Sequence, residues 1–274
     1  MRNSDSKKDL ESTPLISKVD QRGINRLILS RPAVRNAFDE VLVDEFVKHL
    51  KYAKNNDYIR VLVIESVGET FSAGADLTWM KRMADSGLDE NIKDARKLAN
   101  MLHMLNILEK PVIAKVQGSA FGGGVGLIAA SDIAIASSEV KFSLPEVRLG
   151  LIPATIAPYV IDAIGRRASS RLFLSGETFS AEEAKDLGLV HECVSPEKLD
   201  LRTEGMINDL LMCAPKAVAE AKKLIHYLSD NHIKSKSLIE ETARRIAKIR
   251  SSDEAREGIN SFLEKRPANW TRIK

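Results

Sequence analysis

The sequence predicts an α/β protein with a largely parallel sheet, followed by a helical C-terminal region. Apolar strand-like runs alternate with helical patterns from about residue 15 to residue 137. Strands joined by helices usually pair in parallel, with helices covering the faces of the sheet. From residue 155 onward helical patterns dominate, and the polar segment SPEKLD (195–200) marks a boundary. We therefore expect a disordered tail over 1–12, an α/β core over 13–198 and a helical region over 199–274.

Composition narrows the class of protein. A chain of 274 residues with 44% hydrophobic residues can bury one large core. The 41 basic and 38 acidic residues give a net charge of +3, which demands neither nucleic acid nor an anionic membrane as a partner. The two cysteines have no metal-ligand spacing. The first twelve residues lack the apolar segment of a secretory signal, and no apolar run is long enough to span a bilayer. We expect a cytoplasmic protein that binds no metal.

The elements of the α/β core follow from the spacing of apolar residues. Two β-type runs at the start predict a hairpin, and the patterns after them alternate between helix and buried strand. In order, we expect strands over 15–20 and 24–30, a helix over 39–56 that starts near Asp39, a strand over 60–66, a helix over 90–108, a strand over 111–118, a helix over about 123–131 and a strand over 132–137. Three further helices, charged on one side, are expected over 203–229, 231–250 and 253–265.

Two loops of the predicted core share one design. FSAGADL (71–77) follows one strand and AFGGGVG (120–126) follows another, and each precedes a helix. Glycine permits positive φ and a close approach of the backbone to a ligand, and the start of a helix leaves N–H groups unpaired. Two such loops that face each other would direct two backbone N–H groups at one oxygen, as in an oxyanion hole.

The two loops are also compatible with tight strand–helix packing or with phosphate binding. A single glycine run serves more often to pack a strand tightly against a helix, with no ligand at all. A phosphate cradle is a further possibility, but the GxxxxGK[ST] motif is absent and the GxGxxG pattern of dinucleotide sites is not met. The two loops together are more specific than either alone.

These loops, together with three other segments, resemble the enoyl-CoA hydratase/isomerase (crotonase) superfamily. The other segments are RPAVRNAF (31–38), KFSLPEVRLGLIPA (141–154) and FLEKRPANW (262–270), and the resemblance runs from about residue 13 to residue 270. It implies a crotonase-like ββα superhelix core with a C-terminal helical trimerisation region. It also implies a homotrimer or hexamer, and an acyl-CoA thioester as substrate. No separate cofactor is expected, because coenzyme A is part of the substrate.

The resemblance assigns roles residue by residue. The backbone N–H groups of Ala75 and Gly123 would hold the thioester oxygen, and Glu146 matches a catalytic glutamate. The implied substrate-binding residues are Val34, Arg35 and Ala37 along coenzyme A, Ala73, Asp76, Leu77, Thr78, Gly122 and Gly126 around the acyl group, and Phe262 and Lys265, often from a neighbouring subunit. The chemistry agrees with these roles, since arginine and lysine pair with phosphates and a buried glutamate can move a proton.

Gly126 departs from the pattern of the family. Most hydratases of the family carry a second glutamate twenty residues before the one that Glu146 matches, and here that position is Gly126. LIPATIAPYVIDAIG (151–165) resembles bacterial 3-methylglutaconyl-CoA hydratases, so we favour a hydratase that works with one glutamate. An enoyl-CoA isomerase, which needs only one carboxylate, is the alternative. A naphthoate synthase type is a third, but it usually has aspartate at position 146.

We interpret Gly126 as a specificity feature. Without a side chain there, the site would have room for a branched acyl group. It would also lack a negative charge close to a substrate carboxylate, which would otherwise cost about 1–4 kcal/mol. Among the neighbouring residues, Trp79 and Met80 would either line the acyl pocket or pack in the core, and Arg148 would pair with Glu146, pair with an acidic substrate, or lie on the surface.

Two other classes of function receive less support. Basic helical runs at 216–228 and 243–250 raise RNA binding, but acidic residues interleave with them and there is no aromatic stacking platform, so we do not expect it. A catalytically inert family member would not need Glu146 and both loops, and the sequence retains all three.

Overall fold

The computed structural model describes residues 13–229 and 236–271, and the tail expected over 1–12 lies outside them. The described strands form two sheets rather than the single sheet that the sequence suggested. The larger sheet has the order β1 (Leu15–Val19), β2 (Ile24–Leu29), β3 (Val61–Ser66), β5 (Val112–Val116), β7 (Ile133–Ser137) and β10 (Glu192–Val194). The smaller sheet has the order β4 (Thr70–Ser72), β6 (Ser119–Phe121), β8 (Lys141–Ser143) and β9 (Thr178–Ser180).

Both sheets are largely parallel, as predicted. In the larger sheet only the hairpin β1–β2 is antiparallel, and every other pair of neighbours runs in parallel. In the smaller sheet β4, β6 and β8 are parallel and β9 is antiparallel to β8. Each strand of the smaller sheet has three residues, too short for an alternating pattern to be read from the sequence.

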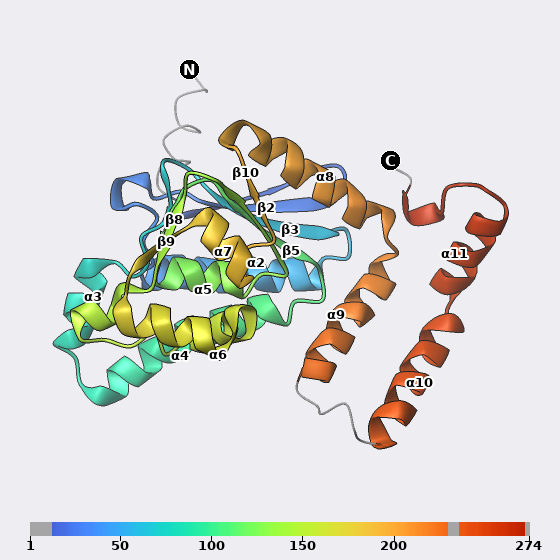
Figure 1. Cartoon of the computed structure of the whole chain (residues 1–274). Coiled ribbons are helices and arrows are strands. Elements are labelled where there is room, and N and C mark those ends of the chain that lie inside the picture. Colours follow the sequence, from blue (N-terminus) through green and yellow to red (C-terminus); the bar gives the residue numbers. More distant parts are fainter. Residues whose placement is uncertain (1–12, 230–235, 272–274) are drawn as a thin grey trace.

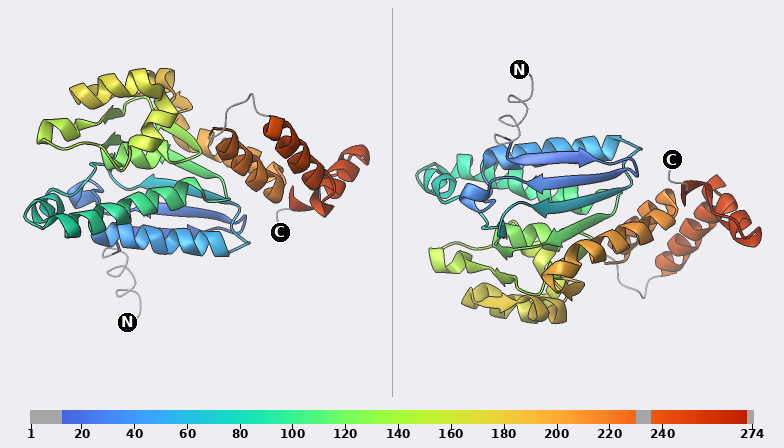
Figure 2. Two further views of the ribbon diagram at one scale, coloured as in Figure 1. Left: turned by 90° about the horizontal axis from the view of Figure 1, so that it is seen from below. Right: turned by 90° about the horizontal axis from the view of Figure 1, so that it is seen from above.

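The helices cover both faces of the larger sheet and extend beyond it (Figures 1 and 2). They are α2 (Glu40–Asn55), α3 (Leu77–Ala84), α4 (Leu88–Asn106), α5 (Gly123–Ala129), α6 (Ala157–Ser175), α7 (Ala181–Leu187), α8 (Leu199–Met212), α9 (Pro215–Ser229), α10 (Lys236–Arg250) and α11 (Asp253–Leu263). Short 3-10 turns occur at η1 (Pro32–Val34), η2 (Pro145–Leu149), η3 (Pro196–Lys198) and η4 (Asn269–Thr271). No helix in the described ranges is long and apolar enough to cross a membrane.

Strand β3 shows why the larger sheet is covered on both sides. Val61 to Ile64 are all buried, which is the pattern of a parallel strand between two layers of helices. Leu62 and Ile64 belong to the main core, and Val61 and Val63 pack in a second cluster with Ile207 of α8. Helix α8 therefore seals the face of the sheet that the main core leaves open.

One of the predicted C-terminal helices is in fact two. The sequence suggested a single helix over 203–229, but α8 ends at Met212 and α9 begins at Pro215. Cys213 has extended backbone angles, φ −85° and ψ 148°. Proline disfavours the helical conformation in the residue before it and has no N–H to donate, so the helix breaks at this point. After the break, α9, α10 and α11 lead away from the sheets (Figure 1).

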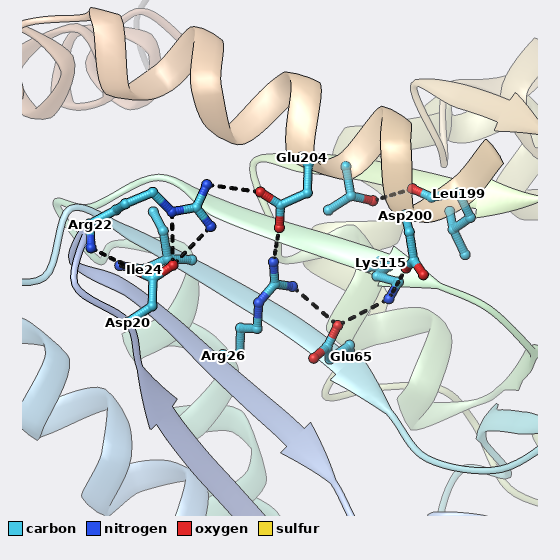
Figure 3. A network of polar contacts seen from close by, with 10 residues as sticks. Asp20, Arg22, Ile24, Arg26, Glu65, Lys115, Leu199, Asp200 and Glu204 are labelled. Carbon is cyan, nitrogen blue, oxygen red and sulfur yellow. Dashed lines mark hydrogen bonds and ion pairs between the residues drawn. The ribbon is translucent and has the colours of Figure 1, made fainter. Parts of the chain in front are cut away.

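A network of charged side chains joins α8 to the sheet (Figure 3). Arg26 of β2 pairs with Glu204 of α8 and, at 3.3 Å, with Glu65 of β3. Lys115 of β5 contacts the same Glu65 at 3.3 Å and pairs with Asp200 of α8. Cations on the sheet thus alternate with carboxylates, and the network fixes where the C-terminal helical region leaves the core.

Candidate active site

The two glycine loops come into direct contact, as their shared design suggested. Gly74 has φ +84°, and a Cβ on it would lie 2.9 Å from the carbonyl oxygen of Phe121 and 3.6 Å from the amide nitrogen of Gly123. A side chain at residue 74 would therefore be strained and would push the loops apart. The parallel strands β4 and β6 hold the two loops in register, because each loop follows one of them.

Local hydrogen bonding leaves the N–H of Ala75 in one loop and of Gly123 in the other available. Gly123 is the first residue of α5, so its N–H has no acceptor within the helix. In the first loop, Phe38 donates its N–H to Gly74 O at 2.7 Å and accepts from Asp76 N at 2.8 Å, forming a parallel bridge opposite Ala75. The N–H of Ala75 lies between these two bonds and does not take part in them. Two N–H groups on touching loops are the elements of an oxyanion hole.

Glu146 brings a carboxylate to the same place. It lies in the turn η2, and its Oε1 is close to the backbone of Gly122. A Cβ added to Gly122 would be 2.9 Å from this oxygen. Its Oε2 is buried and has no hydrogen-bond partner. Burial raises the pKa of this carboxyl above its ordinary value. Arg148 does not neutralise it, because its guanidinium is directed at the carbonyl of Ser175 at 3.4 Å.

A cavity of about 480 Å³ joins the loops and the carboxylate. Its wall is mostly apolar, and among residues 13–229 and 236–271 Glu146 is the only one in the lining with an ionisable side chain. Of the residues that the sequence singled out, Ala73, Ala75, Leu77, Gly122, Gly123, Glu146, Trp79 and Met80 line this cavity. An apolar cavity with a few convergent polar groups is typical of a small-molecule site.

Other predicted substrate-binding residues do not line the cavity. Asp76 caps α3, accepting from Thr78 N at 2.9 Å and from Trp79 N at 3.2 Å, and this cap fixes the loop that carries Ala75. The segment that contains Val34, Arg35 and Ala37 runs alongside the same loop, since Ala73 N donates to Arg35 O at 2.9 Å. These residues border the site rather than form its wall.

The two C-terminal residues lie far from the cavity within one chain. Phe262 is 82% exposed near the end of α11, and Lys265 follows just beyond that helix. Figure 1 shows α11 on the opposite side of the molecule from α3 and α5. The single chain therefore does not bring either residue to the site.

The structure corrects the interpretation of Gly126. This residue is buried inside α5 and does not line the cavity. A Cβ on it would lie 2.1 Å from Cγ2 and 2.6 Å from Cβ of Ile156. The space that the missing side chain leaves is thus filled by Ile156, and it does not enlarge the acyl pocket.

Sequence reasoning missed a whole side of the cavity. Leu149, Gly150, Leu151, Ile152, Pro153, Thr155 and Ile156 all line it, on the segment between η2 and α6. Leu149 and Ile152 remain 59% and 74% exposed, so apolar side chains stand at the mouth. The available signal was the apolar segment LGLIPATI (149–156), which begins three residues after Glu146 and has no helical or strand period.

Comparison with known proteins shows the family of this chain. The family model for enoyl-CoA hydratase/isomerase matches residues 20–273. The chain is 31% identical to the 2,3-dehydroadipyl-CoA hydratase of Escherichia coli, over 91% of this chain and 96% of that protein. It is 28% identical to the trans-2-decenoyl-[acyl-carrier-protein] isomerase of Streptococcus mutans, over 91% and 95%. The crystal structure of an enoyl-CoA hydratase from Shewanella pealeana is 40% identical and superposes with a TM-score of 0.91, covering 98% of this chain and 100% of that one. With its crotonase fold and its apolar cavity around Glu146, this chain belongs to the enoyl-CoA hydratase/isomerase family.

Proposed function

We propose that this protein is a 2-enoyl-CoA hydratase that works with a single glutamate. The observation that carries the proposal is the buried Glu146 carboxylate, whose Oε2 lacks a partner, in the same cavity as the Ala75 and Gly123 loops. A free carboxylate oxygen is available to a water molecule or to a substrate proton. Burial raises the pKa of Glu146, which favours a group that both accepts and returns a proton.

The proposed reaction uses each of these groups once. The thioester carbonyl accepts hydrogen bonds from the N–H groups of Ala75 and Gly123, which stabilise the enolate oxygen as negative charge develops. Glu146 takes a proton from water, and the hydroxide oxygen bonds to C3. The π electrons of the C2–C3 bond move into the enolate. Glu146 then returns the proton to C2, and the enolate collapses to the saturated 3-hydroxyacyl thioester.

For the acyl group we propose 3-methylglutaconyl-CoA, an intermediate of leucine degradation. The support is the resemblance of 151–165 to hydratases of that substrate. The cavity adds a condition, because its described lining includes no lysine, arginine or histidine to pair with the second carboxylate of this substrate. We therefore place that carboxylate in water at the mouth of the cavity, near Leu77 and Ile152, which are both 74% exposed.

Isomerisation of a 3-enoyl-CoA is the second candidate, and one observation favours it. Ile156 fills the space beside Gly126, so α5 offers no second polar group to hold an attacking water. An isomerase needs none, because Glu146 would take a proton from C2 and return it to C4. The likeness to an acyl-carrier-protein isomerase supports the same alternative.

We propose in addition that the protein assembles as a homotrimer or hexamer through its C-terminal helices. Large apolar side chains of α9, α10 and α11 are more than half exposed in the single chain: Ile225, Ile239, Ile246, Ile259, Phe262 and Leu263. An exposed apolar surface of this kind is typical of an interface. A neighbouring copy would also bring Phe262 and Lys265 to the coenzyme A end of the site. Light scattering that gives the mass of a monomer would refute the assembly.

The reaction is tested by following the absorbance of the conjugated enoyl thioester. We expect loss of this absorbance with 3-methylglutaconyl-CoA and with crotonyl-CoA. A rise in absorbance with a 3-enoyl-CoA, without loss on either 2-enoyl substrate, would make the protein an isomerase. No change with any of the three would remove the proposed function.

A further inference from the structure

Ile156 is held rigidly between α5 and the cavity. It lies at the residue before α6, its carbonyl accepts from Tyr159 N and Val160 N at 3.1 Å, and its side chain is 2% exposed. A β-branched side chain on a fixed backbone has little rotational freedom. One side of it packs against Gly126, and another belongs to the cavity wall.

Ile156 and Gly126 pack so closely that neither position can change without affecting the other. A Cβ on residue 126 would come within 2.1 Å of Ile156 Cγ2, closer than packed carbon atoms approach. Any side chain on α5 at this point would therefore have to displace Ile156 or replace it. The cavity wall next to α5 is therefore made by Ile156, an apolar and rigidly held residue from the segment before α6.

We propose that Ile156 is a specificity-determining residue, whose side chain closes the cavity against α5 and limits the length of the acyl chain. The inference rests on the proposed function in one respect, that the cavity receives the acyl group of a thioester. If the side chain is shortened, the cavity extends toward Gly126 and a longer chain fits. If a methyl group is then added on residue 126, part of that new space closes again.

The test compares the binding of butanoyl-CoA and octanoyl-CoA by calorimetry, because saturated thioesters bind whether the enzyme is a hydratase or an isomerase. We expect Ile156→Ala to raise the ratio of octanoyl-CoA to butanoyl-CoA affinity by about 10-fold or more, since one methylene in an apolar pocket is worth about 10–200-fold. Gly126→Ala added to Ile156→Ala should bring the ratio back toward that of the wild type. Gly126→Ala alone should lower the melting temperature more than it does in the presence of Ile156→Ala.

Ile164→Ala is the matched control. It makes the same change inside α6, the helix that Ile156 precedes, at a residue that is 8% exposed and does not line the cavity, so the ratio should stay at the wild-type value. A ratio within two-fold of the wild type in folded Ile156→Ala, or an equal shift in Ile164→Ala, would overturn the proposal. If Ile156→Ala does not fold, Ile156→Val should give a smaller shift in the same direction, and no shift would overturn it.

The outcome can be separated from that of the proposed function. A wild-type protein that binds both thioesters but turns over no enoyl-CoA would remove the hydratase and isomerase reactions and leave the affinity ratio as a valid test of Ile156. A wild-type protein that binds neither thioester would remove both.

Discussion

The carboxylate of Glu146 lies directly against the backbone of Gly122, with its Oε1 2.9 Å from the position that a Cβ on residue 122 would take. Gly122 also has φ +48° and ψ −114°, a conformation that residues with a side chain rarely adopt. Gly122, the N-cap of α5, therefore shapes the loop of Gly123 and also leaves space for the carboxylate of Glu146. The proposed oxyanion donor, Gly123, and the proposed acid–base group, Glu146, therefore both adjoin Gly122.

Substitution of Gly122 by alanine should consequently damage both parts of the site. We expect a loss of about 1–3 kcal/mol in the free energy of unfolding from the strained backbone, and a fall in kcat of about 100-fold or more as Glu146 is displaced. Gly165→Ala serves as the control, because Gly165 does not line the cavity, its φ of +72° is also positive, and a Cβ there would touch nothing within 4 Å. Equal kcat in the two variants would show that the contact with Glu146 is unimportant.

Burial of Glu146 predicts opposite effects of pH on activity and on stability. Because the pKa is raised, the ionised base is lost at a higher pH than for an ordinary glutamate, so kcat/KM should fall as the pH is lowered through that raised value. In the same range the folded state holds a proton that the unfolded state has released. The free energy of unfolding therefore decreases as the pH rises from the ordinary value through the raised one.

Glu146→Gln removes this titration. Its free energy of unfolding relative to the wild type should increase with pH and level off above the raised pKa. Denaturant unfolding of both proteins from about pH 4, below the ordinary glutamate pKa, to about pH 8 measures the difference. A difference that is constant over this range would contradict a raised pKa for Glu146.

The ion pair of Lys222 with Asp132 should matter far more than its neighbours on α9. Lys222 is 8% exposed and its Nζ lies 2.7 Å from Asp132 Oδ2. Burial raises the pKa of Asp132 and lowers the pKa of Lys222, so each charge depends on the other. Lys222→Met should cost about 3 kcal/mol of unfolding free energy because it leaves the partly buried Asp132 carboxylate without its cation.

Lys223→Met is the natural comparison for that variant. Lys223 pairs with Glu109 at 2.9 Å and with Glu220 at 3.0 Å, but its side chain is 42% exposed. Pairs of this kind contribute about 0–1 kcal/mol. Urea titrations in which the two variants lose the same stability would refute the distinction.

Asp76 should act on catalysis through position and not through contact with substrate. Asp76→Ala removes the cap of α3 and should lower stability by about 1 kcal/mol. It should also lower kcat, because the loop that carries Ala75 loses its anchor. Ser252→Ala removes an equivalent cap, from Ser252 Oγ to Ala255 N at 3.1 Å on α11, and should cost similar stability with unchanged kcat. Parallel effects of the two variants on kcat would show that capping of α3 does not position the loop.

The sequence predicted the elements whose patterns are long enough to be read. Helix α2 has buried residues at 42, 46 and 50 and a cap at Asp39, so its period and its start are both visible in the sequence. Strands β4, β6 and β8 have three residues each and exist because they pair with one another, which no local pattern reveals. The break before α9 was overlooked although Pro215 signals it.

The candidate site could also be predicted only in part from the sequence. The loops of Ala75 and Gly123 and the carboxylate of Glu146 were found from small residues and a motif, and the structure brings them to one cavity. We predicted open space at Gly126 because the sequence shows that a side chain is missing there. The sequence does not show which neighbouring residue fills that space. Ile156 lies thirty positions later and meets Gly126 only through the packing of α6 on α5.

In the proposed reaction, Glu146 alone performs the proton transfers on a thioester held by the two loops. The most direct measurement is the rate at which the conjugated enoyl absorbance of 3-methylglutaconyl-CoA and crotonyl-CoA disappears, with wild-type protein and with Glu146→Gln, alongside the binding of butanoyl-CoA by each. We predict turnover by the wild type, a loss of about 10²–10⁴-fold or more in Glu146→Gln, and similar binding by both. Turnover by Glu146→Gln at the wild-type rate would contradict the claim.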